Sequence, residues 1–140
     1  MNKIKKKIRL FKLLEKLKKR DLYVLLNNAN LINEEVEKTN LLLAKIHNII
    51  QENVETIDKN LLGATFKNKS KVINIMSKQK QITENKKNFL LEQKYKTDIE
   101  IAKTLIQKDK IKKKVHNKRL EYGEFQDLKL EITNRNLKKN

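Results

Sequence analysis

Apolar residues between positions 22 and 57 recur in strict alternation of three and four residues. This spacing averages 3.5 residues, which keeps one stripe of a helix facing a partner helix in a left-handed coiled coil. The stripe is formed by Leu22, Leu25, Ala29, Ile32, Val36, Thr39, Leu43, Ile46, Ile50, Asn53 and Ile57. Only Thr39 and Asn53 in it are polar. The pattern predicts a long helix with one packed face.

A second helical stretch follows, with sparser apolar positions. Between residues 77 and 88 only Ile82 is apolar, and four lysines share the segment. Because ordering a residue costs about 1–2 kcal/mol of conformational entropy, we expect residues 67–88 to fray or bend. The apolar positions expected to pack are Phe66, Val72, Ile73, Met76, Ile82, Phe89, Leu90, Ile99, Ala102, Leu105, Ile106, Ile111, Val115, Leu120, Phe125, Leu128 and Ile132.

The connection between the two stretches is predicted at residues 58–65. Gly63 is a natural left-handed cap for the end of the first helix, and Thr65 can cap the start of the second. The predicted fold is all-α: one domain, residues 1–140, forming a long antiparallel two-helix coiled-coil hairpin. Its first arm covers about 4–61, its turn about 62–65 and its second arm about 66–136. The same heptads also allow a parallel dimer, so the oligomeric state stays open.

Composition supports an elongated helical chain and gives no sign of an enzyme. The chain has no proline, two glycines and no cysteine, with 38% apolar and 36% charged residues. The two histidines, His47 and His116, are far apart and have no cysteine or paired acid at ligand spacing. We therefore expect no catalytic, cofactor-binding or metal site. No apolar run approaches the roughly 20 residues of a membrane span, so we expect a soluble or peripheral protein, and the lack of cysteine fits a cytoplasmic location.

The net charge of +17 is unevenly distributed. Residues 1–20 carry +9, residues 21–62 carry −4, residues 63–97 carry +7 and residues 98–140 carry +5. An acidic first arm beside a basic second arm predicts flanking ion pairs between the two. Lysine supplies 30 of the 34 basic residues, and Lys, Asn and Ile are what an AT-rich genome over-supplies. The charge thus has two explanations, mutational bias and a polyanionic partner.

Two segments carry more information about partners. Ile4, Ile8, Phe11 and Leu14 share one helical face ringed by lysines, which suits an anionic membrane, an acidic groove or the start of the coil. The second segment, residues 41–50, is apolar on more than one face. Its surplus apolar residues, Leu41, Leu42 and Ile49, predict a third packing element.

These features resemble the stalk proteins of type III protein export, the FliJ and YscO type of flagella and injectisomes. The resembling stretches are the leucine- and lysine-rich opening at Leu10–Arg20, the periodic first arm to Ile57, and the closing run. That run passes from Glu92-Gln93-Lys94-Tyr95 through Lys118-Arg119-Leu120-Glu121 to Asp127-Leu128-Lys129-Leu130-Glu131. The likeness covers most of the chain and is compositional and periodic.

The resemblance implies a stalk in the pore of a hexameric export ATPase that also contacts the export gate and export chaperones. The paired chain ends would face the ring through Lys5, Lys6, Lys7, Arg9, Arg119 and Arg135. The gate contact would fall on the first arm near Leu43, Ile46 and Ile50, with Leu42 among the surplus apolar residues. The chain would be cytoplasmic, with peripheral contact at the inner membrane as a further option. The alternatives are a basic coiled-coil protein that binds nucleic acid or the ribosome, and a membrane-peripheral structural adaptor.

Overall fold

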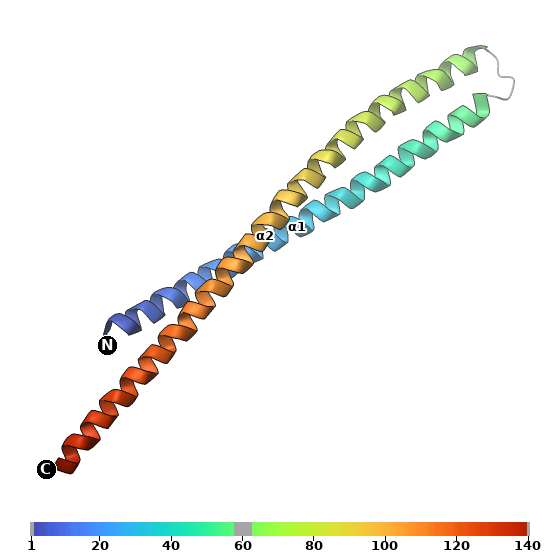
Figure 1. Ribbon diagram of the computed structural model, residues 1–140. Helices are drawn as coiled ribbons and strands as arrows, with labels where there is room; N and C mark the ends of the chain where they lie inside the picture. The colour runs from blue at the N-terminus through green and yellow to red at the C-terminus, as the bar shows by residue number, and fades with distance from the viewer. Residues whose placement is uncertain (1, 58–62, 140) are drawn as a thin grey trace. The chain divides into compact units, whose positions relative to one another are not determined.

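The protein consists of two α-helices over the residues that the structure, a computed structural model, describes: 2–57 and 63–139. Helix α1 spans Asn2–Ile57 and helix α2 spans Gly63–Lys139 (Figure 1). The chain divides into two compact units. Unit 1 combines Met1–Leu26 with Ile99–Asn140, and unit 2 is Asn27–Asp98. In each unit a segment of α1 packs against a segment of α2, which confirms the predicted all-α two-helix hairpin.

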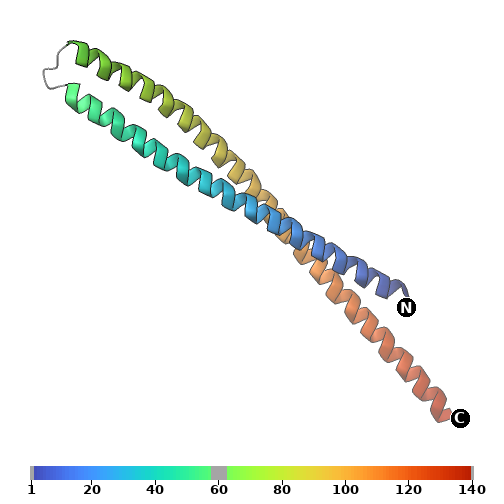
Figure 2. The ribbon, with the colours of Figure 1, turned by 180° about the vertical axis from the view of Figure 1, so that it is seen from behind.

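The helices run antiparallel within each unit, as the two ribbon views show (Figures 1 and 2). In unit 1 the Lys5 Nζ lies 5.5 Å from the ring centroid of Tyr122. Further along α1, the Phe11 ring centroid lies 5.9 Å from the Nζ of Lys114. A later residue of α1 thus faces an earlier residue of α2, which defines the register of the pair.

The helix boundaries differ from the prediction at the start of α2. Gly63 is the first residue of α2 rather than the cap of α1, and its φ is not in the left-handed region. Thr65 is half-buried inside the first turns of α2 instead of capping them. The rest of the predicted connection, residues 58–62, lies outside the described residues. The apolar spacing predicted both helices correctly. The cap roles assigned to Gly63 and Thr65 were wrong, and they put the predicted start of α2 about three residues too late.

The predicted stripe of α1 is the face that packs against α2. Every stripe position from Leu22 to Asn53 is buried or half-buried, with Ala29, Thr39 and Ile46 exposing 9%, 3% and 5% of their surface. The side chain of Ile57 lies outside those described. The stripe extends towards the N-terminus through half-buried Ile4, Ile8, Phe11 and Leu14, as the sequence suggested.

The inward face of α2 corrects the sequence analysis. Of the residues expected to pack there, Ile82, Phe89 and Ile106 are 60%, 58% and 57% exposed. Val72 and Ile73 are half-buried as expected. From residue 76 to 122, one set of buried and half-buried positions keeps a three–four spacing and includes lysines and threonines. They are Met76, Lys80, Thr83, Lys87, Leu90, Lys94, Thr97, Ile101, Thr104, Lys108, Ile111, Val115, Lys118 and Tyr122. The helix runs without interruption through residues 67–88.

Three buried threonines allow polar residues to occupy the helix interface at little cost. The Oγ1 atoms of Thr39, Thr83 and Thr104 each donate a hydrogen bond to the carbonyl oxygen four residues earlier, at 2.7, 2.7 and 2.8 Å. Each hydroxyl is therefore satisfied within its own helix and needs no partner across the interface. Their small side chains let the two backbones approach. The half-buried lysines bury their aliphatic stems while the ammonium groups reach water.

Candidate interaction surfaces

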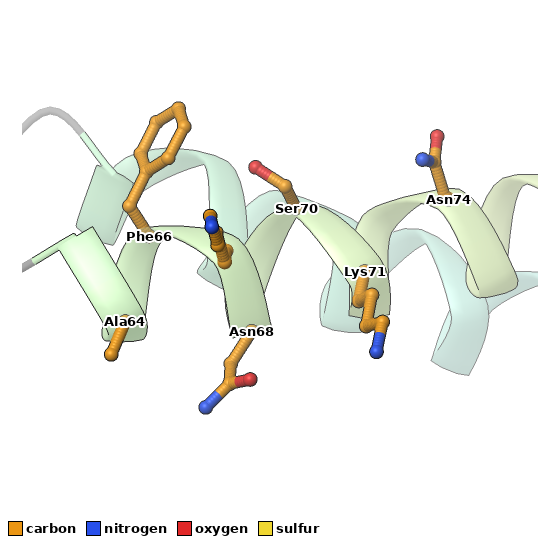
Figure 3. A pocket seen from close by; sticks show the side chains of 7 residues that line it. Ala64, Phe66, Asn68, Ser70, Lys71 and Asn74 are labelled. Atoms are coloured by element: carbon orange, nitrogen blue, oxygen red, sulfur yellow. The ribbon is translucent and has the colours of Figure 1, made fainter.

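The described residues contain no cluster of metal-ligating side chains. His47 and His116 are both exposed, and no group of three or more His, Asp or Glu side chains in the described ranges could hold a metal ion. A hollow near the start of α2 is lined by residues of that helix alone, including Phe66, Ser70 and Lys71 (Figure 3). The polar ends of these side chains do not converge on one point, so the hollow offers no binding geometry.

Unit 1 brings together most of the basic residues predicted to contact an ATPase ring. Lys5, Lys6, Lys7 and Arg9 are exposed on the first turns of α1. Lys5 lies over the ring of Tyr122, and exposed Arg119 lies one turn before that tyrosine on α2. A cation over an aromatic face gains electrostatic stabilisation, which fixes this end of α1 against α2. The five cations therefore make the surface around this end of the helix pair basic, with Lys5, Lys6 and Lys7 pointing in different directions around α1.

Arg135 lies away from that surface, on a part of α2 that extends past the start of α1 (Figures 1 and 2). Because Lys5 is level with Tyr122, Arg135 lies 13 residues, about 20 Å, beyond the level of Lys5. All residues from 127 to 137 are exposed. Arg135 pairs with Glu131 one turn earlier, at 3.0 Å from its Nη2 to Oε1. We call residues 127–137 the overhang.

The residues predicted to contact an export gate divide between two environments in unit 2. Leu43 and Ile50 are half-buried and Ile46 is 5% exposed, all on the face packed against α2. Their side chains are occupied by packing within the hairpin. Leu42, in contrast, is 49% exposed, and its neighbours Leu41 and Ile49 are 65% and 37% exposed. The surplus apolar residues of this segment are thus the ones available to a partner.

Leu42 forms part of a shallow groove between the two helices of unit 2. The groove is lined by Thr39 and Leu42 from α1 and by Ile82 and Thr83 from α2, with charged residues at its edge. The Nζ of Lys86 lies 3.7 Å from Oε2 of Glu35 across the helices. Among the described residues this is the one ion pair that joins α1 to α2; the others lie within one helix. The predicted rows of flanking pairs are reduced to a single pair, which contributes little because both partners are about half exposed.

The two units also differ in net charge. Unit 1 contains 22 lysines and arginines against eight aspartates and glutamates, a net charge of +14. Unit 2 contains 12 against nine, a net charge of +3. Sequence zoning missed this contrast because the basic opening and the lysine-rich run at 108–119 are far apart along the chain. The hairpin places them in the same unit.

Neither helix, over the described residues, has a stretch long and apolar enough to cross a bilayer. Comparison of the chain with protein-family models, with curated proteins and with solved structures gives no match.

Proposed function

We propose that this chain is a non-enzymatic coiled-coil stalk of a type III protein export apparatus. In this proposal it couples the export ATPase ring to the export gate and assists delivery of chaperone–substrate complexes. The observation that supports it is the form of unit 1. Two antiparallel helix ends carry a net charge of +14, and one of them extends past the other as an exposed overhang. Such an end suits insertion into a ring whose lining is acidic.

The gate contact in this proposal moves to the exposed residues of unit 2. Leu41, Leu42 and Ile49 have apolar surface to bury, whereas Ile46 has almost none left. Burying an apolar side chain that is already packed gains nothing, so the exposed residues carry the free energy of such a contact. The packed residues Leu43, Ile46 and Ile50 would hold this segment of α1 against α2 and so keep the exposed residues in place.

The test is a binding assay with the export ATPase and the cytoplasmic domain of the export gate from the same source. The variant Lys5→Glu, Lys6→Glu, Lys7→Glu is compared with a matched reversal in unit 2, Lys67→Glu, Lys71→Glu, Lys78→Glu. All six lysines are exposed, so both variants change the charge equally. Lys5 also contacts the Tyr122 ring across the helix pair, so circular dichroism must show that the first variant keeps its helicity. We expect the first variant to lose ring binding and the second to keep it. Failure of the unaltered chain to bind either protein would reject the export assignment.

A second candidate function is polyanion binding by unit 1. Seven lysines and arginines lie between residues 108 and 119 of α2, in the unit that already carries the basic opening. Phosphate contacts of this kind release counterions, so affinity for a short DNA or RNA duplex would fall steeply as salt rises. Tight duplex binding at about 150 mM salt, where the screening length is about 8 Å, would favour this candidate over the export stalk.

A further inference from the structure

Helix α1 carries a second apolar stripe in unit 1, on the side opposite its packed face. Leu10, Leu13, Leu17 and Val24 are 53%, 56%, 46% and 50% exposed. Leu10, Leu13 and Leu17 keep the three–four spacing of a coiled-coil seam, and Val24 follows one heptad later. We call these four residues the outer stripe. In heptad geometry Leu10, Leu13 and Leu17 point about 150° away from the face that packs against α2. Val24, at the end of the stripe, borders a hollow that α2 also lines.

The outer stripe is bordered by positive charge. Lys6, Arg9, Lys16 and Arg20 occupy the helical positions beside or within it, and all four are exposed. In the described part of the chain none of the four takes part in an ion pair. The nearest acidic residue on the same helix edge is Asp21, in a groove with Glu100 at the Val24 end. Leu10, Leu13 and Leu17 therefore form an apolar surface with basic residues along its edges, and acidic residues occur only near Val24.

We infer that the outer stripe binds an acidic amphipathic helix of another protein, which would complete a three-helix bundle in unit 1. Leucines at three–four spacing fit between the side chains of a facing helix, and acidic residues on the flanks of that helix would meet the basic border. Leu10 and Val24 lie 14 positions apart, about 21 Å along the helix, which corresponds to two heptads of a partner. This inference rests on exposure and charge, and it does not depend on the export assignment.

Two other occupants fit the stripe less well. A second copy offering the same stripe would bring like charges face to face, which opposes association. An anionic membrane favours a broad apolar face. The stripe of Leu10, Leu13 and Leu17 is narrow and aliphatic, and the exposed Tyr23 and Leu26 lie beyond Arg20, which interrupts it. A narrow stripe is what a facing helix requires.

The experiment titrates the full-length protein with a labelled helical peptide of about three heptads, carrying leucine at the seam positions and glutamate on both flanks. A peptide of the same composition in scrambled order measures the contribution of charge alone. The test variant is Leu13→Asn with Leu17→Asn. Its matched control is Leu120→Asn with Leu128→Asn, which removes two leucines of similar exposure, 55% and 58%, from α2 in the same unit.

We expect the patterned peptide to bind the unaltered protein and the α2 control alike, and to bind the stripe variant about a hundredfold more weakly, roughly tenfold for each leucine. The variant Lys16→Gln with Arg20→Gln leaves the leucines in place and should weaken binding more at low salt than at high salt. Circular dichroism of each variant checks that helicity is unchanged.

Equal binding of the patterned and scrambled peptides would overturn the inference, because charge alone would then explain the affinity. Unchanged binding by the stripe variant would overturn it as well. Vesicles containing phosphatidylserine form a separate arm. If they bind through Leu13 and Leu17 while the peptide does not bind, the stripe is a membrane surface and the helix partner is rejected.

Discussion

Individual side chains determine how tightly the two helices pack. In unit 2, Thr39 of α1 and Thr83 of α2 line the same groove. Each hydroxyl donates a hydrogen bond to a carbonyl oxygen of its own helix. A hydroxyl bonded in this way costs little when buried, yet it contributes less apolar contact than a methyl group of the same size. The threonines thus make the interface possible without making it strong.

Replacing Thr39 by valine is therefore expected to stabilise the protein. The carbonyl of Glu35 keeps its backbone hydrogen bond in the helix, and the added methyl is buried, so the free energy of unfolding should rise by about 1 kcal/mol. Urea unfolding followed by circular dichroism measures the change. The control is Thr133→Val, because Thr133 makes the same type of bond, 2.9 Å to the Lys129 carbonyl, at an exposed position. A loss of stability in Thr39→Val would show that the hydroxyl has a further role.

Ile46 represents the opposite case, an apolar side chain that is almost fully packed. Ile46→Asp would bury a carboxylate without a partner and remove the packing, at a cost of about 3 kcal/mol or more. We expect unit 2 to lose its helix pairing, measured as a lower melting temperature and lower helicity. Leu41→Asp, at a position 65% exposed five residues earlier, should leave both nearly unchanged. Similar melting of the two variants would contradict the assigned packed face.

At the scale of elements, α1 and α2 were predictable to different degrees. The stripe of α1 was found because apolar residues are concentrated on one face, and its positions from 22 to 53 all lie inward. In α2 the apolar residues occur all round the helix. Ile82 and Phe89 lie outward while Lys80 and Lys87 lie inward, so no periodicity in α2 alone identifies the packed face. That face is set by the register with α1, a tertiary constraint that composition does not contain.

The uneven interface predicts uneven protection along α2. Between residues 77 and 88 the positions on the three–four spacing are Lys80, Thr83 and Lys87, whereas between 101 and 118 they include Ile101, Ile111 and Val115. Amide hydrogen exchange should therefore be faster in residues 77–88 than in residues 101–118, because opening the first segment exposes less apolar surface. The overhang, which packs against no part of α1, serves as the unprotected reference. Uniform exchange across both segments would contradict the prediction.

The candidate surfaces were partly visible before the fold was known. The basic opening and the surplus residues Leu41, Leu42 and Ile49 were identified from the sequence, since charge runs and excess apolar residues are local features. The outer stripe was not, because its leucines lie within the same turns as the packed Ile8, Phe11 and Leu14. Two apolar stripes on one helix can be told apart only when it is known which side of that helix faces the partner helix. The concentration of charge in unit 1 likewise depends on the pairing of distant segments.

For the whole molecule the dominant electrostatic term is self-repulsion. The net charge of +17 is concentrated in unit 1, where the α1 and α2 segments are both basic, so pairing them places like charges near one another. Raising salt from about 10 mM to about 300 mM shortens the screening length several-fold, so the melting temperature should rise. Differential scanning calorimetry across this range provides the measurement. A melting temperature that falls with salt would mean that attractive pairs outweigh repulsion.

The antiparallel register of unit 2 makes the length of the hairpin adjustable in steps. Seven residues inserted into α1 near residue 43, matched by seven in α2 near residue 76, would add about 10 Å and preserve every seam position on both sides. An insertion in one helix alone would slide the two stripes past each other and exchange the partners of all later residues. Divergent versions of this chain should therefore differ in length by paired heptads, so that one length change predicts the location of its counterpart in the other helix.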